Sequence, residues 1–256
     1  MMTNRRDGGS PLLRTALIAM FAALAYLATL IHIPYPAPVG TPFIHLGNII
    51  PILAALLLGG WQGGLAGAIG MGLFDLSFGY TSTLLKTILL KFGIGLTTGL
   101  VASFGRRHPE KSPRAALGVC SAVSFAAGLL LLGGRLLGAA DFLKIPAVAY
   151  LFLILLGAVL GLASFFAPRL RFMNNERLFA LLGATAGIAF NAAGEFVGGV
   201  ITKLLTGAVW QAAVVASVAS LPATLINGTF SIVGALLLYL PLRQALRRAH
   251  LAHLVK

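Results

Sequence analysis

The stretch IHLGNIIPILAALLLGGWQGGLAGAIGMGLFDLSFGY, residues 44–80, decides the fold class. It holds two apolar runs, 44–59 and 61–78, and Asp75 is its only acidic residue. A helix needs about 20 apolar residues to cross a hydrocarbon core about 30 Å thick. The whole chain is similar, with 58% hydrophobic and 10% charged residues, whereas soluble domains carry about 25% charged residues. The sequence therefore predicts a membrane protein made of α-helices.

Further apolar stretches outside this region predict the number of spans. The full set of eight is 12–31, 44–59, 61–78, 83–104, 115–134, 145–167, 178–205 and 212–242. Arginines before the first stretch are typical of a signal peptide, but the rest of the chain is equally apolar, so we interpret 12–31 as a retained helix. The predicted fold is all-α, a polytopic transmembrane bundle, with residues 1–256 forming one membrane domain.

The basic residues predict the orientation. A net charge of +13 is typical of nucleic-acid binding in a soluble protein, but here the cations lie in short clusters between apolar runs. With a cytoplasmic N-terminus, 14 of the 19 basic residues fall inside, as the positive-inside rule requires. These are Arg5, Arg6, Arg14, Arg106, Arg107, Lys111, Arg114, Arg169, Arg171, Arg177, Arg243, Arg247, Arg248 and Lys256. Both termini are therefore predicted to be cytoplasmic, with 243–256 as a basic tail at the membrane surface. Arg135 and Lys144 fall outside.

The loop HIPYPAPVGTPFIH, residues 32–45, contains four prolines and no acidic residue, lysine or arginine. Prolines fix the backbone and prevent helix, so the sequence predicts a stiff outer loop. It is either a lid or a plain connector. Small residues repeat every four positions from Gly59 to Gly72, which indicates close helix packing in lipid.

Several polar side chains interrupt the predicted spans, where ionisable groups indicate function by default. In the predicted orientation they share the outer half of the membrane or its centre, which predicts a small polar pocket beneath the 32–45 loop. They are Asn48, Asp75, Lys86, Lys91, Asn191, Glu195 and Asn227. The alternative is a structural salt bridge, for example between Asp75 and Lys86. Lys203 is expected to extend its ammonium to the outer interface.

No motif indicates an enzyme. The chain lacks HExxH and zinc-ligand spacings, GxSxG, and the phosphate loop GxxxxGK[ST]. Asp75 lacks the second intramembrane aspartate of an aspartyl protease, and Cys120 is the only cysteine. We expect no catalytic residue, metal or cofactor.

Residues 44–80 and the following TSTLLKTILLKFGIGLTTGLVA, 81–102, resemble the S component of an energy-coupling factor (ECF) transporter. The shared features are the proline-bearing first loop, an HLG[DN] motif at 45–48, Asp75, and lysines in the fourth helix. The ending 220–246 is similar to the family's last helix, with Asn227 at its asparagine. The first helix carries a face of small residues, Ala16, Ala19 and Ala23, similar to the family's alanine motif. The resemblance covers about residues 12–104 and 185–246.

The resemblance implies a six-helix core, so the pair 115–134 and 145–167 is expected to be an insertion, within 105–177. It further implies capture of a water-soluble vitamin or precursor of the riboflavin, pyridoxine or thiamin-precursor class, at the bacterial cytoplasmic membrane. Energy would come from a transmembrane coupling subunit, docked on the alanine face, and two ATPase subunits. The residues implied to bind substrate are Tyr35, His45, Asn48, Asp75, Tyr80, Lys86, Lys91, Asn191, Glu195 and Asn227. The competing hypothesis is a self-contained secondary carrier with Glu195 as its proton-coupling group, although no inverted repeat is evident.

Overall fold

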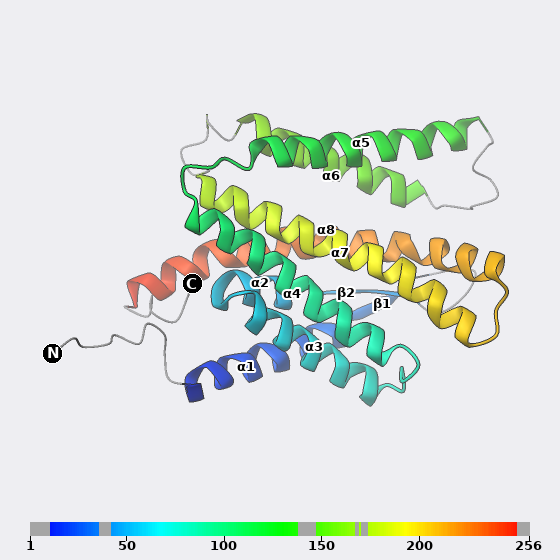
Figure 1. The fold of residues 1–256 in the computed structure, drawn as a ribbon, viewed down its shortest axis with the longest axis horizontal. Helices are drawn as coiled ribbons and strands as arrows, with labels where there is room; N and C mark the ends of the chain where they lie inside the picture. The colour runs from blue at the N-terminus through cyan, green and yellow to red at the C-terminus, as the bar shows by residue number, and fades with distance from the viewer. Residues whose placement is uncertain (1–10, 36–41, 138–146, 167–168, 170–173, 250–256) are drawn as a thin grey trace.

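A computed structural model describes residues 11–35, 42–137, 147–166, 169 and 174–249, and they form a helical bundle with one short β-hairpin (Figure 1). The elements are α1 (Pro11–Leu30), β1 (His32–Pro34), β2 (Phe43–His45), α2 (Ile49–Leu58), α3 (Gly60–Ser77), α4 (Leu84–Arg107), α5 (Arg114–Leu136), α6 (Ala147–Phe166), α7 (Asn175–Leu205) and α8 (Trp210–Arg248). Five of them, α1, α4, α5, α7 and α8, are long and apolar enough to cross a membrane. The prediction of an all-α polytopic bundle is confirmed.

The predicted span 44–59 is wrong in one respect. Its first residues form β2, and α2 is a helix of only 10 residues. At 1.5 Å per residue it is about 15 Å long, half of the hydrocarbon core. Every residue from Pro51 to Leu58 is buried, so α2 is a core helix and does not cross the bilayer alone. Hydropathy cannot separate the two cases, because a buried helix and a lipid-facing helix are equally apolar.

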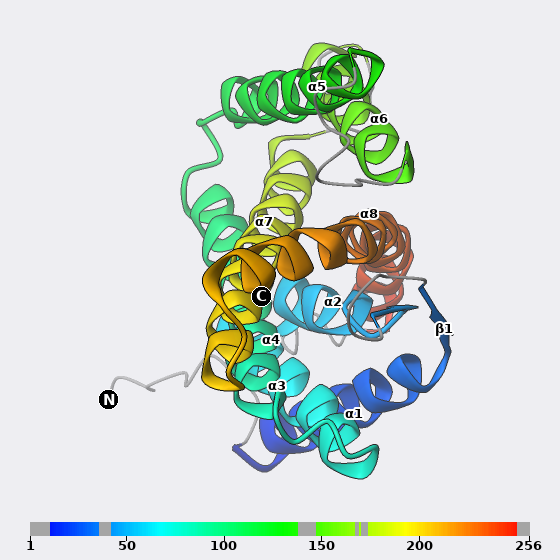
Figure 2. The same ribbon diagram turned by 90° about the vertical axis from the view of Figure 1, so that its right-hand side faces the viewer.

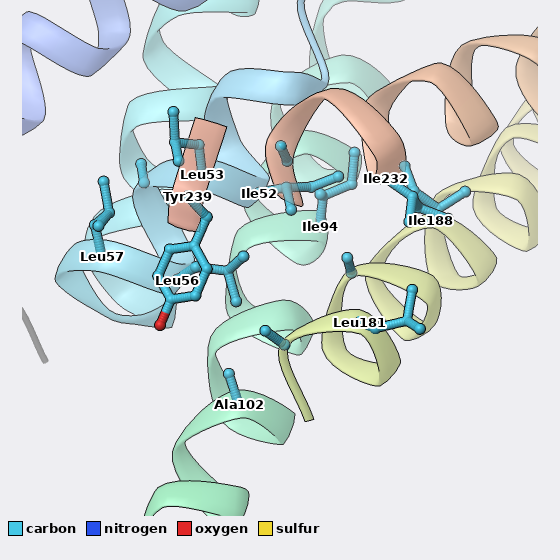
Figure 3. Close-up of a cluster of buried hydrophobic side chains, with 14 of the residues drawn as sticks. Ile52, Leu53, Leu56, Leu57, Ile94, Ala102, Leu181, Ile188, Ile232 and Tyr239 are labelled. Atoms are coloured by element: carbon cyan, nitrogen blue, oxygen red, sulfur yellow. The ribbon is translucent and has the colours of Figure 1, made fainter. Parts of the chain in front are cut away.

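The hydrophobic core surrounds α2. Side chains of α2 such as Ile52 and Leu56 lie against Ile94 of α4, Ile232 of α8 and neighbouring apolar groups (Figure 3). Helices α1, α3, α4 and α8 all contact α2. The short helix thus fixes the positions of the longer helices around it.

Glycines allow α3 to pack closely on α2 and α4, as the repeat predicts. Gly59 has φ of 107°, a conformation that favours glycine, and it separates the end of α2 from the start of α3. A Cβ atom at Gly63 would collide with the backbone of Ala55, and one at Gly95 would collide with the backbone of Gly64. In lipid, such close backbone contact supplies the packing that the hydrophobic effect does not.

One end of the bundle collects the basic residues. The start of α1, the end of α8, the α4–α5 connection and the start of α7 lie at the same end (Figure 1). Arg243 of α8 forms an ion pair with Glu176 of α7, and Asn175 Nδ2 donates to Pro109 O at 3.0 Å. This agrees with the predicted clustering, while the orientation in the cell stays a prediction. Some of the residues used for it lie outside the described residues, namely Arg5, Arg6, Lys144, Arg171, Lys256 and the tail from 250 onward.

Helices α5 and α6 lie within the expected insertion, 105–177, and form an antiparallel pair along one edge of the bundle. Ser121 Oγ donates to Gly157 O at 2.6 Å, and Ser164 Oγ donates to Arg114 O at 2.8 Å. The pair contacts α7 and α8, and it lies at the edge opposite α1 (Figure 2). The core of the bundle therefore stands between this pair and α1.

Candidate functional site

A cavity of about 290 Å³ lies beneath the β-hairpin, with walls from α3, α4, α7 and α8. Seven of the ten predicted site residues line it: His45, Asp75, Tyr80, Lys86, Lys91, Glu195 and Asn227. Asn191 lies behind the wall and contacts Lys91, whereas Tyr35 and Asn48 do not line the cavity. The structure therefore brings most of the predicted polar groups together.

Glu195 of α7 joins two lysines of α4. Lys86 Nζ lies 2.6 Å from Glu195 Oε2, and Lys91 Nζ lies 3.7 Å from Glu195 Oε1. Lys91 is buried and also donates to Asn191 Oδ1 at 2.9 Å. The suggested Asp75–Lys86 salt bridge is not among the ion pairs of the described residues, because Lys86 pairs with Glu195 instead. The pairing couples α4 to α7 across the cavity wall.

Asn227 of α8 holds the hairpin over the cavity. The His45 amide donates to Asn227 Oδ1 at 2.9 Å, and Asn227 Nδ2 donates to Phe43 O at 2.9 Å. We call these two hydrogen bonds the hairpin latch. They occupy both ends of the Asn227 amide group, so its main contacts are with β2.

The two ends of the predicted stiff loop 32–45 pair with each other and form this hairpin. His32 of β1 pairs with His45 of β2, and the Tyr35 amide donates to Pro42 O at 2.8 Å. Residues 36–41 lie outside the described residues. Partial burial raises the pKa of the Tyr35 phenol.

His45 lies in the hairpin, before α2 begins. Burial, and secondarily the charge of Lys91, lower the pKa of His45 to about 3. Its Nδ1 accepts a hydrogen bond from the Gly47 amide at 3.0 Å, which requires an unprotonated nitrogen. His45 is therefore a neutral group at the roof of the cavity.

Aromatic rings cover the side of the cavity next to α3. The ring centroids of Phe43 and Tyr80 are 6.0 Å apart, and the rings of Phe74 and Tyr80 are stacked at 6.2 Å with 16° between their planes. A turn positions Tyr80: its amide donates to Asp75 O at 2.8 Å, and Gly79 adopts φ of 76°. The cavity thus has an aromatic side and a charged side.

The residue patterns missed two contributors. Lys203 was expected to extend to the interface, but it lines the cavity and donates to Ser217 Oγ at 3.2 Å. Its spacing of eight residues from Glu195 places both on one helix face, a signal that could have identified it. On α8 the patterns predicted Asn227 but missed the polar residues that precede it at three- and four-residue spacing, Ser217, Ser220 and Thr224.

The predicted docking face of α1 points away from the bundle. Ala16, Ala19 and Ala23 are exposed, whereas Ala22 and Ala25 on the other side of the helix are buried. A Cβ atom at Gly70 of α3 would collide with the backbone of Ala22. The small exposed face is therefore separate from the face that packs on α3.

The cavity's donor set is suited to binding polar molecules. Lysine and amide groups donate hydrogen bonds, and carboxyl groups accept them. Among the described residues, no group of three or more His, Cys, Asp or Glu side chains is arranged to hold a metal ion. Most residues that line the cavity are polar or charged, and Phe43, Met71 and Ala223 are among the apolar ones.

Comparisons with known proteins add to this geometry. The family model described as "ECF-type riboflavin transporter, S component" matches residues 12–143, slightly more than half of the chain. A protein of Pyrococcus woesei, described as an uncharacterized protein in the gap 3′ region, is 36% identical over 77 residues. That alignment covers 30% of this chain and 50% of the relative, so the chain spans about half the length of the curated relative it matches. No solved structure matches the chain.

Proposed function

The chain belongs to the family of S components of ECF-type riboflavin transporters, and on that premise we propose that it captures a water-soluble vitamin or vitamin precursor from outside the cell. The family consists of transporter components and not of enzymes, and its members bind their substrate in the membrane. The riboflavin, pyridoxine and thiamin-precursor class contains the substrates to test first.

One observation carries the proposal: a cavity lined mostly by polar residues lies within an apolar bundle. Lysines and carboxylates are expensive inside a membrane and are retained where they serve a site or pair with one another. Lys86, Lys91 and Glu195 pair, yet they also line a cavity large enough for a small molecule. The aromatic side of the cavity supports a planar ring as the ligand, because stacked and edge-on ring contacts are favourable.

The energy for uptake would come from other subunits. The chain contains no phosphate loop, and the family implies a transmembrane coupling subunit and two ATPase subunits as partners. The exposed Ala16, Ala19 and Ala23 face is the proposed docking surface, since small side chains let two helices approach closely in lipid. The proposed location is the bacterial cytoplasmic membrane, with both termini in the cytoplasm.

Mass spectrometry tests the proposal directly. The detergent-solubilised protein is purified from its expression host and denatured, and the released small molecules are identified. We expect a vitamin or precursor at close to one molecule per chain, and less of it from Glu195→Ala. A Lys111→Ala variant is the control, because Lys111 lies at the far, basic end of the bundle.

The competing hypothesis makes a different prediction for uptake. Cells that express this chain without ATPase and coupling subunits should accumulate no vitamin. Uptake by the chain alone, abolished when the proton gradient is collapsed, would favour the secondary carrier.

A further inference from the structure

Asp75 has an unused hydrogen-bonding position in the cavity wall. Its side chain is only 7% exposed and lines the cavity. Its Oδ2 atom is buried, and no residue that the structure describes donates a hydrogen bond to it. A buried carboxyl oxygen without a donor is costly, so this atom needs a partner that the described chain does not provide.

Asp75 takes part in none of the ion pairs of the described residues. Three ammonium groups line the cavity, those of Lys86, Lys91 and Lys203. Glu195 supplies the carboxylate that pairs with two of them. Both ion pairs with lysines of α4 go to Glu195 and none to Asp75. Asp75 therefore has no cationic partner among the described residues, and its buried Oδ2, in a side chain that lines the cavity, has no donor among them.

The backbone also places Asp75 next to the aromatic side. Phe74, its neighbour in sequence, stacks on Tyr80, and the Tyr80 amide is bound to Asp75 O. A planar ring lying against Phe43 and Tyr80 would present an edge toward Asp75. A donor on that edge would lie near Asp75 Oδ2, which has no hydrogen-bond donor among the described residues.

We infer that Asp75 Oδ2 accepts a hydrogen bond from an N–H or O–H group on the edge of a planar heterocyclic ligand. Asp75 thereby selects ligands whose ring carries a donor on that edge. This inference rests on the proposed function, and it goes further by assigning one recognition contact to one atom.

A double-mutant-type cycle tests the hydrogen bond between Asp75 and the ligand. One change methylates the donor on the ligand, and the other substitutes Asp75 in the protein. Riboflavin is the first probe, because N3–H is the only N–H donor on its ring system. The second pair of probes is pyridoxine and its 3-O-methyl ether. The third pair is the 4-aminopyrimidine thiamin precursor and its dimethylamino analogue. For whichever parent binds the purified protein, isotherms are measured for parent and methylated probe on the unmodified chain and on Asp75→Leu. Leucine has the same branching at Cγ as aspartate, although it is larger, and it accepts no hydrogen bond.

We expect methylation to weaken binding to the unmodified chain by about ten- to hundred-fold. On Asp75→Leu the parent and the methylated probe should bind within about two- to three-fold of each other, since there is no acceptor to lose. A steric clash of the methyl group would instead persist in Asp75→Leu and would overturn the inference. Ser77→Ala, an exposed change at the same end of α3, is the control and should keep the full methylation effect.

The outcomes separate this inference from the proposed function. A parent probe that binds with the same methylation effect in Asp75→Leu overturns the inference alone. Failure of every parent probe to bind, with no vitamin recovered by mass spectrometry, overturns both. If Asp75→Leu does not fold, the comparison is made with Asp75→Asn, in which loss of the charge should reduce the methylation effect.

Discussion

At the scale of single residues, the Lys86–Glu195–Lys91 group is the feature whose alteration is most informative. Glu195 has two cationic partners, whereas Lys86 has one carboxylate partner. Glu195→Ala leaves both lysines without a carboxylate, while Lys86→Ala leaves Glu195 with Lys91. The two substitutions should therefore differ in their effect on stability.

We expect Glu195→Ala and Lys86→Ala each to weaken vitamin binding by about 1–3 kcal/mol, which is about ten- to hundred-fold. Glu195→Ala should also lower the melting temperature more than Lys86→Ala, because an unpaired charge inside the bundle is destabilising. Isotherms and melting curves of the purified variants, with Lys111→Ala as the control, measure both effects. Unchanged affinity in both variants would contradict the assignment of the site.

The sequence was sufficient to place the polar residues at one level but not to pair them. Topology and helix periodicity place Asp75, Lys86 and Glu195 at similar depths. Whether Lys86 faces α3 or α7 depends on how α4 is rotated, which tertiary packing determines. For the same reason Lys203 could have been assigned to the site from its spacing to Glu195, but its contact with Ser217 could not.

At the scale of elements, the hairpin latch predicts that Asn227 acts on the ligand through β2. Asn227→Ala removes two hydrogen bonds at about 1 kcal/mol each, so the hairpin should open more often. We expect affinity to fall by about ten-fold or more, mainly through faster dissociation, which stopped-flow measurements resolve. Thr229→Ala, whose hydroxyl bonds only within α8, should leave the dissociation rate unchanged. Slower association without faster dissociation would contradict the role of the latch.

The exposed face of α1 predicts a separation of binding from transport. Ala19→Trp or Ala23→Trp should preserve vitamin binding but abolish uptake and copurification with the coupling subunit, because a large side chain prevents close helix approach. Leu24→Trp, at an exposed position of α1 outside the alanine face, is the matched control. Normal transport by both alanine variants would show that α1 is not the docking surface.

The sequence predicted the ends of a helix where the amino-acid composition changes from apolar to polar. It did not predict a boundary that lies inside one apolar run. The ends of α4 and α7 lie close to the predicted ones, because charges and turn residues interrupt the apolar runs there. Within 44–59, β2 and α2 share one apolar run, and the pairing of β2 with β1, Ile44 with Ile33 and His45 with His32, distinguishes the strand from the helix. Contacts of that kind are not visible in hydropathy.

At the scale of the whole molecule, the topology predicts which loops reach each side of the membrane. In a Cys120→Ser background, a cysteine at Thr81 should react with an impermeant thiol reagent added outside. A cysteine at Ser112 should react only after the cells are opened. Both positions are exposed and lie at opposite ends of α4. Val39, within the predicted outer loop 32–45, lies outside the described residues. Labelling of Ser112→Cys in intact cells would invert the proposed orientation.

The hairpin latch also bears on how the protein is made. It connects residues 45 and 227, which are 182 positions apart in the chain. Contacts of such long sequence separation form late, and a ribosome delivers the N-terminal part of a chain first. During synthesis β1 and β2 are thus made long before Asn227, the residue that holds them over the cavity. A nascent chain that stops short of α8 would carry most of the cavity and still be unable to retain a vitamin, so ligand retention reports that the last helix has arrived.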